Sequence, residues 1–295
     1  MRASLAQSLS ERTYVPSGAL PEEALGRGTH LGLVAHADDL EILAYHGILT
    51  AYRDPSQAFV GIVVSDGAGS VRSGPFAELD AAGLVEQRRK EQMRAAEIGR
   101  YAAVTQLGHP SHELKQLCEG KIDEELFELV RLVRPKVLYT HSLFDRHATH
   151  LAVTLRVLRV LRQLAESERP ERVLGVEVWG DLDWLPAGAR VELPVSGEPE
   201  LESALLGAFE SQLSAKRYDL ATVGRRLAHA TFASSHRADV TDRLLLAVDL
   251  GPVVSAPDFE PLAFAERWID ELKAETSARL QALLASESPE IRSDS

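Results

Sequence analysis

Short apolar runs alternate with longer amphipathic stretches along most of the chain. The apolar runs at 30–35, 58–65, 103–107, 136–140 and 172–179 predict strands. Because these runs lack strict alternation of apolar and polar residues, the strands are expected to be buried on both faces.

The stretches between the apolar runs have the period of helices. In "LAVTLRVLRVLRQLAES" the apolar residues recur every three or four positions, which is typical of a helix that packs one face on a sheet. The predicted helices cover 39–53, 84–100, 121–133 and 149–167. Alternating strands and helices predict an α/β fold with a Rossmann-like, mostly parallel sheet flanked by helices and joined by right-handed crossovers.

Two later segments, 243–250 and 264–285, are expected to complete the same domain. The sequence therefore predicts a single domain over 26–285 with a C-terminal extension. Residues 1–25 are polar and small and are interpreted as an N-terminal extension. Residues 286–295, "SESPEIRSDS", have the composition of a disordered tail.

Charge and composition narrow the choice of partners. The formal net charge of −12 makes nucleic acid and anionic membranes poor partners. A single cysteine, Cys118, allows no intrachain disulfide and fits a reducing compartment. The N-terminus lacks the apolar core of a signal peptide, and no stretch approaches the roughly 18 apolar residues of a membrane span. We expect a cytoplasmic protein that acts on a small molecule, and the sequence leaves homo-oligomers open.

Histidines gather where the predicted strands end. In a parallel α/β sheet, ligands bind outside the carboxyl ends of the strands. The histidines at or just after these ends are His36, His109, His112, His141, His147 and His150. One histidine in a loop means little, but six at one edge of a sheet indicate a site.

Two pairs of these residues have the spacing of metal ligands. His36 and Asp39 lie three residues apart at a strand-to-helix turn, and His147 and His150 repeat that spacing before a helix. A catalytic zinc takes three ligands of these types and keeps one position for water. Both residues of the first pair and one histidine of the second would form such a set. Asp38 would then act as general base on the activated water, and the remaining histidine would polarise a carbonyl or protonate a leaving group. This chemistry is hydrolysis of an amide or ester.

Each of these signals also has a purely structural interpretation. Two aspartates at a helix start commonly compensate the helix dipole, and Thr149 is a plausible N-cap. The segment "DGAGSVRSG", 66–74, has the composition of a flexible loop. The first strand is not followed by GxGxxG, and the chain has neither a Walker A sequence nor a GxSxG elbow.

Taken together, the motifs resemble the PIG-L/LmbE-like family of metal-dependent N-acetylglucosamine deacetylases. "AHADDLE" resembles the first family motif, and "DRHATH" stands where the family has its second histidine motif. The remaining matches, in order along 28–240, are Asp66-Gly67, Arg88 to Glu91, Leu107-Gly108 and Ser211-Gln212.

The resemblance implies roles for five residues. His36, Asp39 and His150 would bind the metal, which would be Zn²⁺ or another divalent ion such as Fe²⁺ or Mn²⁺. Asp38 would be the general base, and His147 would stabilise the oxyanion or act as general acid. The products would be acetate and a free amine.

The resemblance also implies substrate contacts. Arg72 and Asp66 are candidates for binding the sugar or its aglycone. "LAYHG" replaces a glycine-rich run of the family, which would place Tyr45 and His46 near the pocket and change which substrate fits.

The second motif departs from the family at Thr149, where many relatives carry an aspartate. A threonine cannot supply the negative charge that raises the pKa of a neighbouring imidazole. Either Asp145 replaces that charge, or His147 is protonated less readily.

The leading hypothesis is a zinc-dependent deacetylase acting on an N-acetylglucosamine-type amino sugar or its glycoside. Two alternatives stay open, namely a hydrolase of another amide with the same metal site and a catalytically weakened sugar-binding relative. The sequence does not identify the aglycone.

Overall fold

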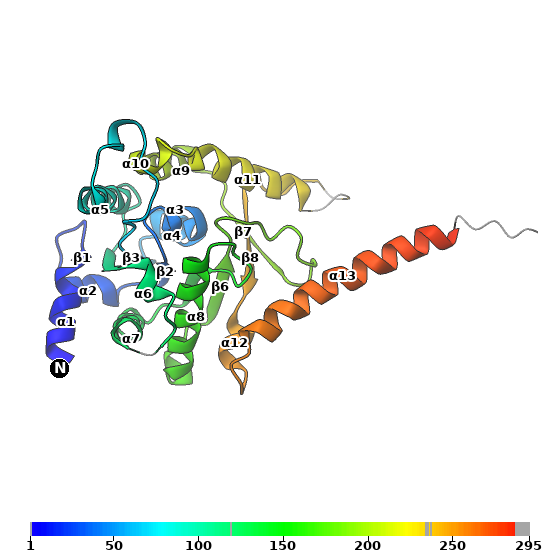
Figure 1. The fold of residues 1–295 in the computed structure, drawn as a ribbon, viewed down its shortest axis with the longest axis horizontal. Coiled ribbons are helices and arrows are strands. Elements are labelled where there is room, and N and C mark those ends of the chain that lie inside the picture. The colour runs from blue at the N-terminus through cyan, green and yellow to red at the C-terminus, as the bar shows by residue number, and fades with distance from the viewer. Residues whose placement is uncertain (1, 119, 234–235, 237, 287–295) are drawn as a thin grey trace, which may run out of the picture.

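The computed structural model describes residues 2–118, 120–233, 236 and 238–286, which form one eight-stranded sheet with helices on both faces (Figure 1). The strands are β1 (Thr13–Tyr14), β2 (His30–Val34), β3 (Phe59–Ser65), β4 (Ala103–His109), β5 (Val137–His141), β6 (Arg172–Val176), β7 (Arg190–Pro194) and β8 (Leu244–Asp249). Their order is β1-β4-β3-β2-β5-β6-β8-β7. The run from β4 to β6 is parallel, whereas β1 pairs antiparallel with β4 and β8 pairs antiparallel with both β6 and β7. The predicted mostly parallel α/β class is confirmed.

The helices cover the two faces of this sheet. They are α1 (Arg2–Glu11), α2 (Pro21–Gly26), α3 (Asp39–Leu43), α4 (Tyr45–Arg53), α5 (Ala81–Ile98), α6 (Ser111–Leu114), α7 (Lys121–Val133), α8 (Ala148–Gln163), α9 (Pro199–Gly207), α10 (Glu210–Leu213), α11 (Tyr218–Phe232), α12 (Gly251–Ser255) and α13 (Pro261–Ser286), with 3₁₀ turns at Gly74–Phe76 and Glu166–Glu168. Along β3, Val60 and Ile62 pack with α7 and α8, while Phe59 and Val63 pack with α3, α4 and α5. Both faces of the strand are therefore buried, as its continuous apolar sequence predicts.

The five strands predicted from apolar runs are all present, with ends shifted by a few residues. Segment 243–250 forms β8, and segment 264–285 lies inside α13. The sequence did not predict β7 or the helices α9, α10 and α11. In Figure 1, α13 extends away from the body, and its first turns pack on the core through Phe264 and Trp268.

The first 26 residues add to the sheet and its core. β1 pairs with the edge strand β4, Thr13 opposite Thr105, and Leu9 and Leu25 are buried in the cluster that contains α7. Of the predicted tail 286–295, only Ser286 lies among the described residues. No helix in the described ranges combines the length and apolar character needed to cross a membrane.

The predicted helix 39–53 is divided at Ala44 into α3 and α4. The Arg226 guanidinium, from α11, donates from Nη2 to the carbonyl oxygens of Glu41 at 2.8 Å and Ile42 at 3.0 Å. In a continuous α-helix these two carbonyls would accept from the backbone four residues ahead. Arg226 replaces those bonds, so the prediction of one helix was wrong because a distant residue ends α3.

Two glycines fix the distance between α3 and the sheet. Gly32 of β2 and Gly61 of β3 pair in register, and the Leu40 side chain packs on both. A Cβ at either glycine would lie 2.5–2.6 Å from a Leu40 methyl group, closer than side-chain carbons approach. The missing side chains therefore let α3 pack directly on β2 and β3.

The Arg226 guanidinium, which ends α3, is buried together with its counter-charge. Glu202 of α9 accepts from Arg226 at 2.6 Å and from Arg243 at 2.9 Å, and both Glu202 and Arg226 are about 1% exposed. The buried pair is stable because each charge has its partner and Arg226 has two carbonyl acceptors besides.

We expect Glu202→Gln to lower the free energy of unfolding by about 3–5 kcal/mol, because it leaves a buried guanidinium without a counter-charge. Urea unfolding monitored by circular dichroism measures this loss. Asp219→Asn is the matched control, because Asp219 pairs with Arg217 at the surface and its removal should not shift the unfolding midpoint. Equal midpoints for all three proteins would contradict the role assigned to Glu202.

Candidate metal centre and its cleft

The predicted site lies at the point in the sheet where the strand order reverses. β2 and β5 are parallel neighbours, and the strands after each of them lie on opposite sides of this pair. Loops leaving such a pair at their carboxyl ends diverge and open a crevice. Residues 36–39 come after β2 and residues 141–150 lie at the end of β5 and beyond it, so both histidine motifs reach this crevice.

The turn after β2 has an uncommon backbone conformation. Asp38 has φ 87° and ψ −30°, although it is not glycine, and Asp39 begins α3 directly after it. The backbone N–H of His36 donates to Oδ2 of Asp39 at 2.7 Å, which closes the turn. A positive φ at a residue with a side chain is a cost that proteins tolerate mainly at functional sites.

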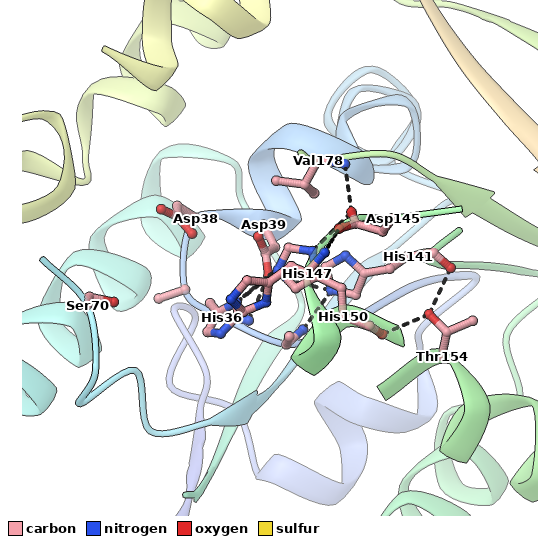
Figure 2. Close-up of polar contacts among 12 residues, drawn as sticks. His36, Asp38, Asp39, Ser70, His141, Asp145, His147, His150, Thr154 and Val178 are labelled. Atoms are coloured by element: carbon pink, nitrogen blue, oxygen red, sulfur yellow. Dashed lines mark hydrogen bonds and ion pairs between the residues drawn. The ribbon is translucent and has the colours of Figure 1, made fainter. Parts of the chain in front are cut away.

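Three ligand atoms from the two motifs converge (Figure 2). Nδ1 of His36 lies 3.0 Å from Nε2 of His150 and 3.2 Å from Oδ2 of Asp39. The third separation, from His150 Nε2 to Asp39 Oδ2, is 3.4 Å. Ligands held about 2.0–2.2 Å from one zinc ion are roughly 3.0–3.5 Å from one another. The three donors therefore fit a single divalent cation.

A second carboxylate lies behind His150. Oδ2 of Asp145 is 3.0 Å from Nδ1 of His150, and the Asp145 side chain is anchored by the backbone N–H groups of His147 and Val178. A carboxylate on the far nitrogen orients a ligating histidine and directs its other nitrogen to the metal. Asp145 therefore acts chiefly on His150, and its weaker effect on the pKa of His147 is outweighed by burial and by His150 and His36.

His141 is a further member of the cluster to which sequence reasoning gave no role. Its Nε2 accepts from the Ala35 N–H at 2.9 Å and lies 3.5 Å from Oδ2 of Asp39, and its ring stacks on His150 with centroids 3.8 Å apart. Asp39, His141 and His150 form one group of close donor atoms, and His36, His147 and His150 form another. Because His141 Nε2 already accepts a hydrogen bond, we assign His141 to support of Asp39 and His150.

Electrostatics favour a cation at this position. Burial alone would raise the pKa of Asp39, but His150, His141 and His36 outweigh it and hold that pKa below its usual range. Burial would lower the pKa of His150, but Asp39 and Asp145 reverse the effect and raise it. The two carboxylates thus stabilise a positive charge on or beside His150, which is either a proton or a metal ion.

Asp38 differs from Asp39 in its surroundings. Figure 2 shows its carboxylate outside the group of histidine rings. Burial raises the pKa of Asp38 to about 7, although Arg88, with Nη2 3.4 Å from Oδ1, opposes the shift. Two adjacent carboxyl groups therefore have pKa values pushed in opposite directions, which is the pattern expected of a ligand beside a proton acceptor.

His147 completes the set that the sequence predicted. Its ring centroid lies 5.1 Å from that of His36 and 4.6 Å from that of His150. Burial lowers the pKa of His147, and the neighbouring His150 and His36 lower it further. The resting imidazole is therefore neutral near pH 7, which suits hydrogen bonding to an oxyanion better than proton donation.

The RxxE segment of α5 supports the site from inside the protein. Arg88 is buried and donates to the Ala37 carbonyl and to the Ser70 hydroxyl. Glu91 accepts from the backbone N–H of Ser211 at 2.8 Å and from its hydroxyl at 2.7 Å. Arg88 and Glu91 are both buried, and each binds a different segment of the chain.

A cleft of about 370 Å³ opens above the cluster and includes His36, Asp38 and Asp39 in its floor. Residues of its wall that sequence reasoning missed are Ser70, Lys115, Trp179, Lys216 and Tyr218. Trp179 lies just past the end of β6, so its position was a usable signal. Lys216 and Tyr218 belong to the region of the unpredicted helices α10 and α11, and no sequence signal placed them at the site.

The four predicted substrate contacts do not line this cleft. Tyr45 is buried under Arg226, at 4.3 Å, and donates to the Glu198 carbonyl. His46 contacts the Tyr139 hydroxyl at 2.7 Å. The Asp66 carboxylate accepts from its own loop at Ala68, and Arg72 is exposed and contacts the same loop. Tyr45 and His46 lie outside the cleft because the helix break at Ala44 changes the direction of the side chains that follow it.

Comparisons with known proteins assign part of the chain to a family. Residues 31–161 match the family model PIG-L, described as GlcNAc-PI de-N-acetylase. The chain thus carries a PIG-L domain over these residues, and the resemblance seen in its motifs is confirmed. Among curated proteins, none matches the chain.

Solved structures share the fold at low sequence identity. GalB, the 4-carboxy-2-hydroxymuconate hydratase from Pseudomonas putida KT2440, is 18% identical, with 78% of this chain and 99% of that chain covered and a TM-score of 0.59. N,N'-diacetylchitobiose deacetylase from Pyrococcus horikoshii is 12% identical, with 83% and 92% covered and a TM-score of 0.56. Dbv21, the A40926 pseudoaglycone deacetylase, is 16% identical, with 76% and 97% covered and a TM-score of 0.56.

We expect Asp145→Asn to weaken binding of zinc by about 10- to 100-fold, because it removes the carboxylate that orients His150. Competition with a chromophoric chelator measures the affinity. Asp183→Asn removes an exposed carboxylate outside the cleft and should leave the affinity unchanged. Equal affinities in the two variants would exclude Asp145 as the support of a ligand.

Another buried carboxyl group belongs to Glu41, within α3. Glu41 is fully buried and accepts from Tyr101 at 2.7 Å and from Gln92 at 2.9 Å. Burial raises its pKa to about 8 from 4.5, against the effect of these two hydrogen bonds. The folded protein therefore keeps a proton that the unfolded chain has already released above pH 4.5.

This difference makes stability depend on pH. The Glu41 contribution is complete below about pH 4.5 and is lost as the pH rises toward 8. Glu41→Gln cannot ionise, so its free energy of unfolding relative to wild type should rise by about 1.4 kcal/mol per pH unit between pH 5 and 8. Urea unfolding at three pH values measures the slope. Glu86→Gln, at an exposed position, should differ from wild type by a constant amount, and a constant difference for Glu41→Gln would refute the shift.

Proposed function

We propose that the protein is a metal-dependent hydrolase that removes the N-acetyl group from an N-acetylglucosamine-type amino sugar or its glycoside. The observation that carries the proposal is the convergence of His36, Asp39 and His150 beside Asp38 in the floor of one cleft. The PIG-L domain and the deacetylases of the same fold support it.

In this proposal the two histidines and Asp39 hold the metal, and each group has its partner. Zn²⁺ and Fe²⁺ both suit a set of two imidazoles and one carboxylate. When bound, the ion supplies Lewis acidity, which polarises the acetyl carbonyl and lowers the pKa of water. Asp145 and His141 keep the ligands in place from behind.

Asp38 moves the proton. With a pKa near 7, it accepts a proton from water and can return it to the amine nitrogen as the amide bond breaks. The amide is split into acetate and a free amine, and one water is consumed. Arg88 favours the ionised form of Asp38, because it offsets part of the effect of burial on the pKa.

His147 acts on the carbonyl oxygen. Its lowered pKa keeps the ring neutral, so a ring N–H donates a hydrogen bond to the negative charge that develops on that oxygen. Thr149 stands at the position that is acidic in many relatives, and it supplies no negative charge that would favour protonation of the His147 ring.

We expect the metal-free protein to release no amine from N-acetylglucosamine derivatives and to regain activity with about one Zn²⁺ or Fe²⁺ per chain. Asp38→Asn should retain the metal and lose about 10²- to 10⁴-fold in kcat. Metal analysis and fluorescamine detection of the amine measure both. Asp183→Asn serves as the control and should behave as wild type.

Full activity of Asp38→Asn would exclude Asp38 as the base. Metal binding without hydrolysis of any N-acetyl compound would instead favour a weakened relative or a different reaction. Since GalB is a hydratase, the panel should include an enol acid such as 2-hydroxymuconate, whose hydration is monitored by loss of ultraviolet absorbance.

A further inference from the structure

The cleft is cationic although the protein as a whole is acidic. The charged side chains in its lining, apart from histidines, are Asp38, Asp39, Arg88, Lys115 and Lys216. Cationic groups outnumber carboxylates here, while the chain carries 44 acidic and 32 basic residues. A bound divalent cation would add to the positive charge.

Most of these charges are compensated inside the cleft. Asp39 lies among histidines, and Arg88 lies 3.4 Å from Asp38 and also donates to the Ala37 carbonyl and the Ser70 hydroxyl. The two lysines differ from them. Neither Lys115 nor Lys216 forms an ion pair or side-chain hydrogen bond with any described residue.

An aromatic wall holds the ammonium group of Lys216. Nζ lies 4.6 Å from the centre of the Trp179 ring, which in turn contacts Tyr218 edge-on at 5.8 Å. The Trp179 ring is also nearly parallel to that of His147, with centroids 6.4 Å apart and planes at 23°. The cation–π contact places a positive charge one aromatic ring away from His147.

Lys115 enters the cleft from another part of the chain. It comes directly after α6, in the segment between β4 and α7, whereas Lys216 lies between α10 and α11. Two ammonium groups from independent segments therefore line one cleft without counter-charge. A group of the substrate that carries negative charge would supply it.

We propose that the substrate carries an anionic group, a carboxylate or a phosphate, which binds to Lys216 and Lys115 while the scissile amide lies at the metal centre. The inference rests on the proposed function for the reaction and adds the class of substrate. The anion belongs to the part of the substrate beyond the acetamido group, because the acetyl carbonyl must reach the floor of the cleft.

The test uses two glycosides that differ only in charge. The first is an N-acetylglucosaminide whose aglycone ends in a carboxylate, and the second carries the primary amide in its place. Calorimetric titration of the metal-loaded protein should show the carboxylate binding about 10-fold more tightly, the factor that a charge-assisted hydrogen bond supplies. The ratio should fall with ionic strength, because exposed charges are screened beyond about 8 Å at physiological salt.

Variants locate the charge. Lys216→Gln and Lys115→Gln should each reduce the ratio of the two affinities, and Lys216→Arg should restore most of it. Lys273→Gln, on the exposed part of α13, changes the net charge equally and should leave the ratio as in wild type. A ratio near one in wild type, no binding of either glycoside, or a preference that survives in the double lysine variant would overturn the inference.

Turnover of the same pair is recorded separately by amine release. Release from both glycosides with equal affinity would refute the anionic substrate alone. Tighter binding of the carboxylate without release from either glycoside would support the charge preference and count against the proposed reaction.

Discussion

One oxygen atom, Oδ2 of Asp39, is the constraint around which the site is built. It accepts the His36 N–H at 2.7 Å and lies 3.2, 3.4 and 3.5 Å from ring nitrogens of His36, His150 and His141. A carboxylate removed from water is tolerated only with hydrogen bonds and positive charge around it. The loops after β2 and β5 must therefore stay together, and the same donor atoms could hold a divalent cation.

The parts of the structure that could be predicted from sequence are those that depend on residues close together in the chain. Buried parallel strands have continuous apolar runs, and donor pairs three residues apart at strand ends identify His36, Asp39, His147 and His150 without knowledge of the fold. The cleft wall could not be predicted this way, because Lys216 and Tyr218 lie far along the chain from both histidine motifs and only the fold brings them to the site. The prediction that Tyr45 and His46 lie near the pocket did not match the structure for another reason. Arg226, nearly two hundred residues away, ends α3 and changes the direction of the side chains of α4.

Several buried polar contacts connect the same turn to the rest of the protein. Arg88 binds the Ala37 carbonyl, Glu41 binds two groups of the α5 region, and Arg226 takes the last carbonyls of α3. Each group is costly to bury, and the hydrogen bonds named here offset part of that cost. They explain why the strained φ at Asp38 persists, since the turn is fixed by contacts from three directions. Arg88 and Glu91, from one segment that resembles a family motif, therefore help to position the turn and its neighbours.

The net charge of the protein is negative, whereas the two lysines in the cleft are positive. An acidic chain repels anions at long range, but that repulsion is screened within about a Debye length of the surface. Inside the cleft, Lys115 and Lys216 act at short range, where screening by salt is weaker than at long range. The acidic surface therefore does not argue against an anionic substrate. It confines the preference to molecules that also fit the cleft, so that shape admits the substrate and the two ammonium groups then select it by charge.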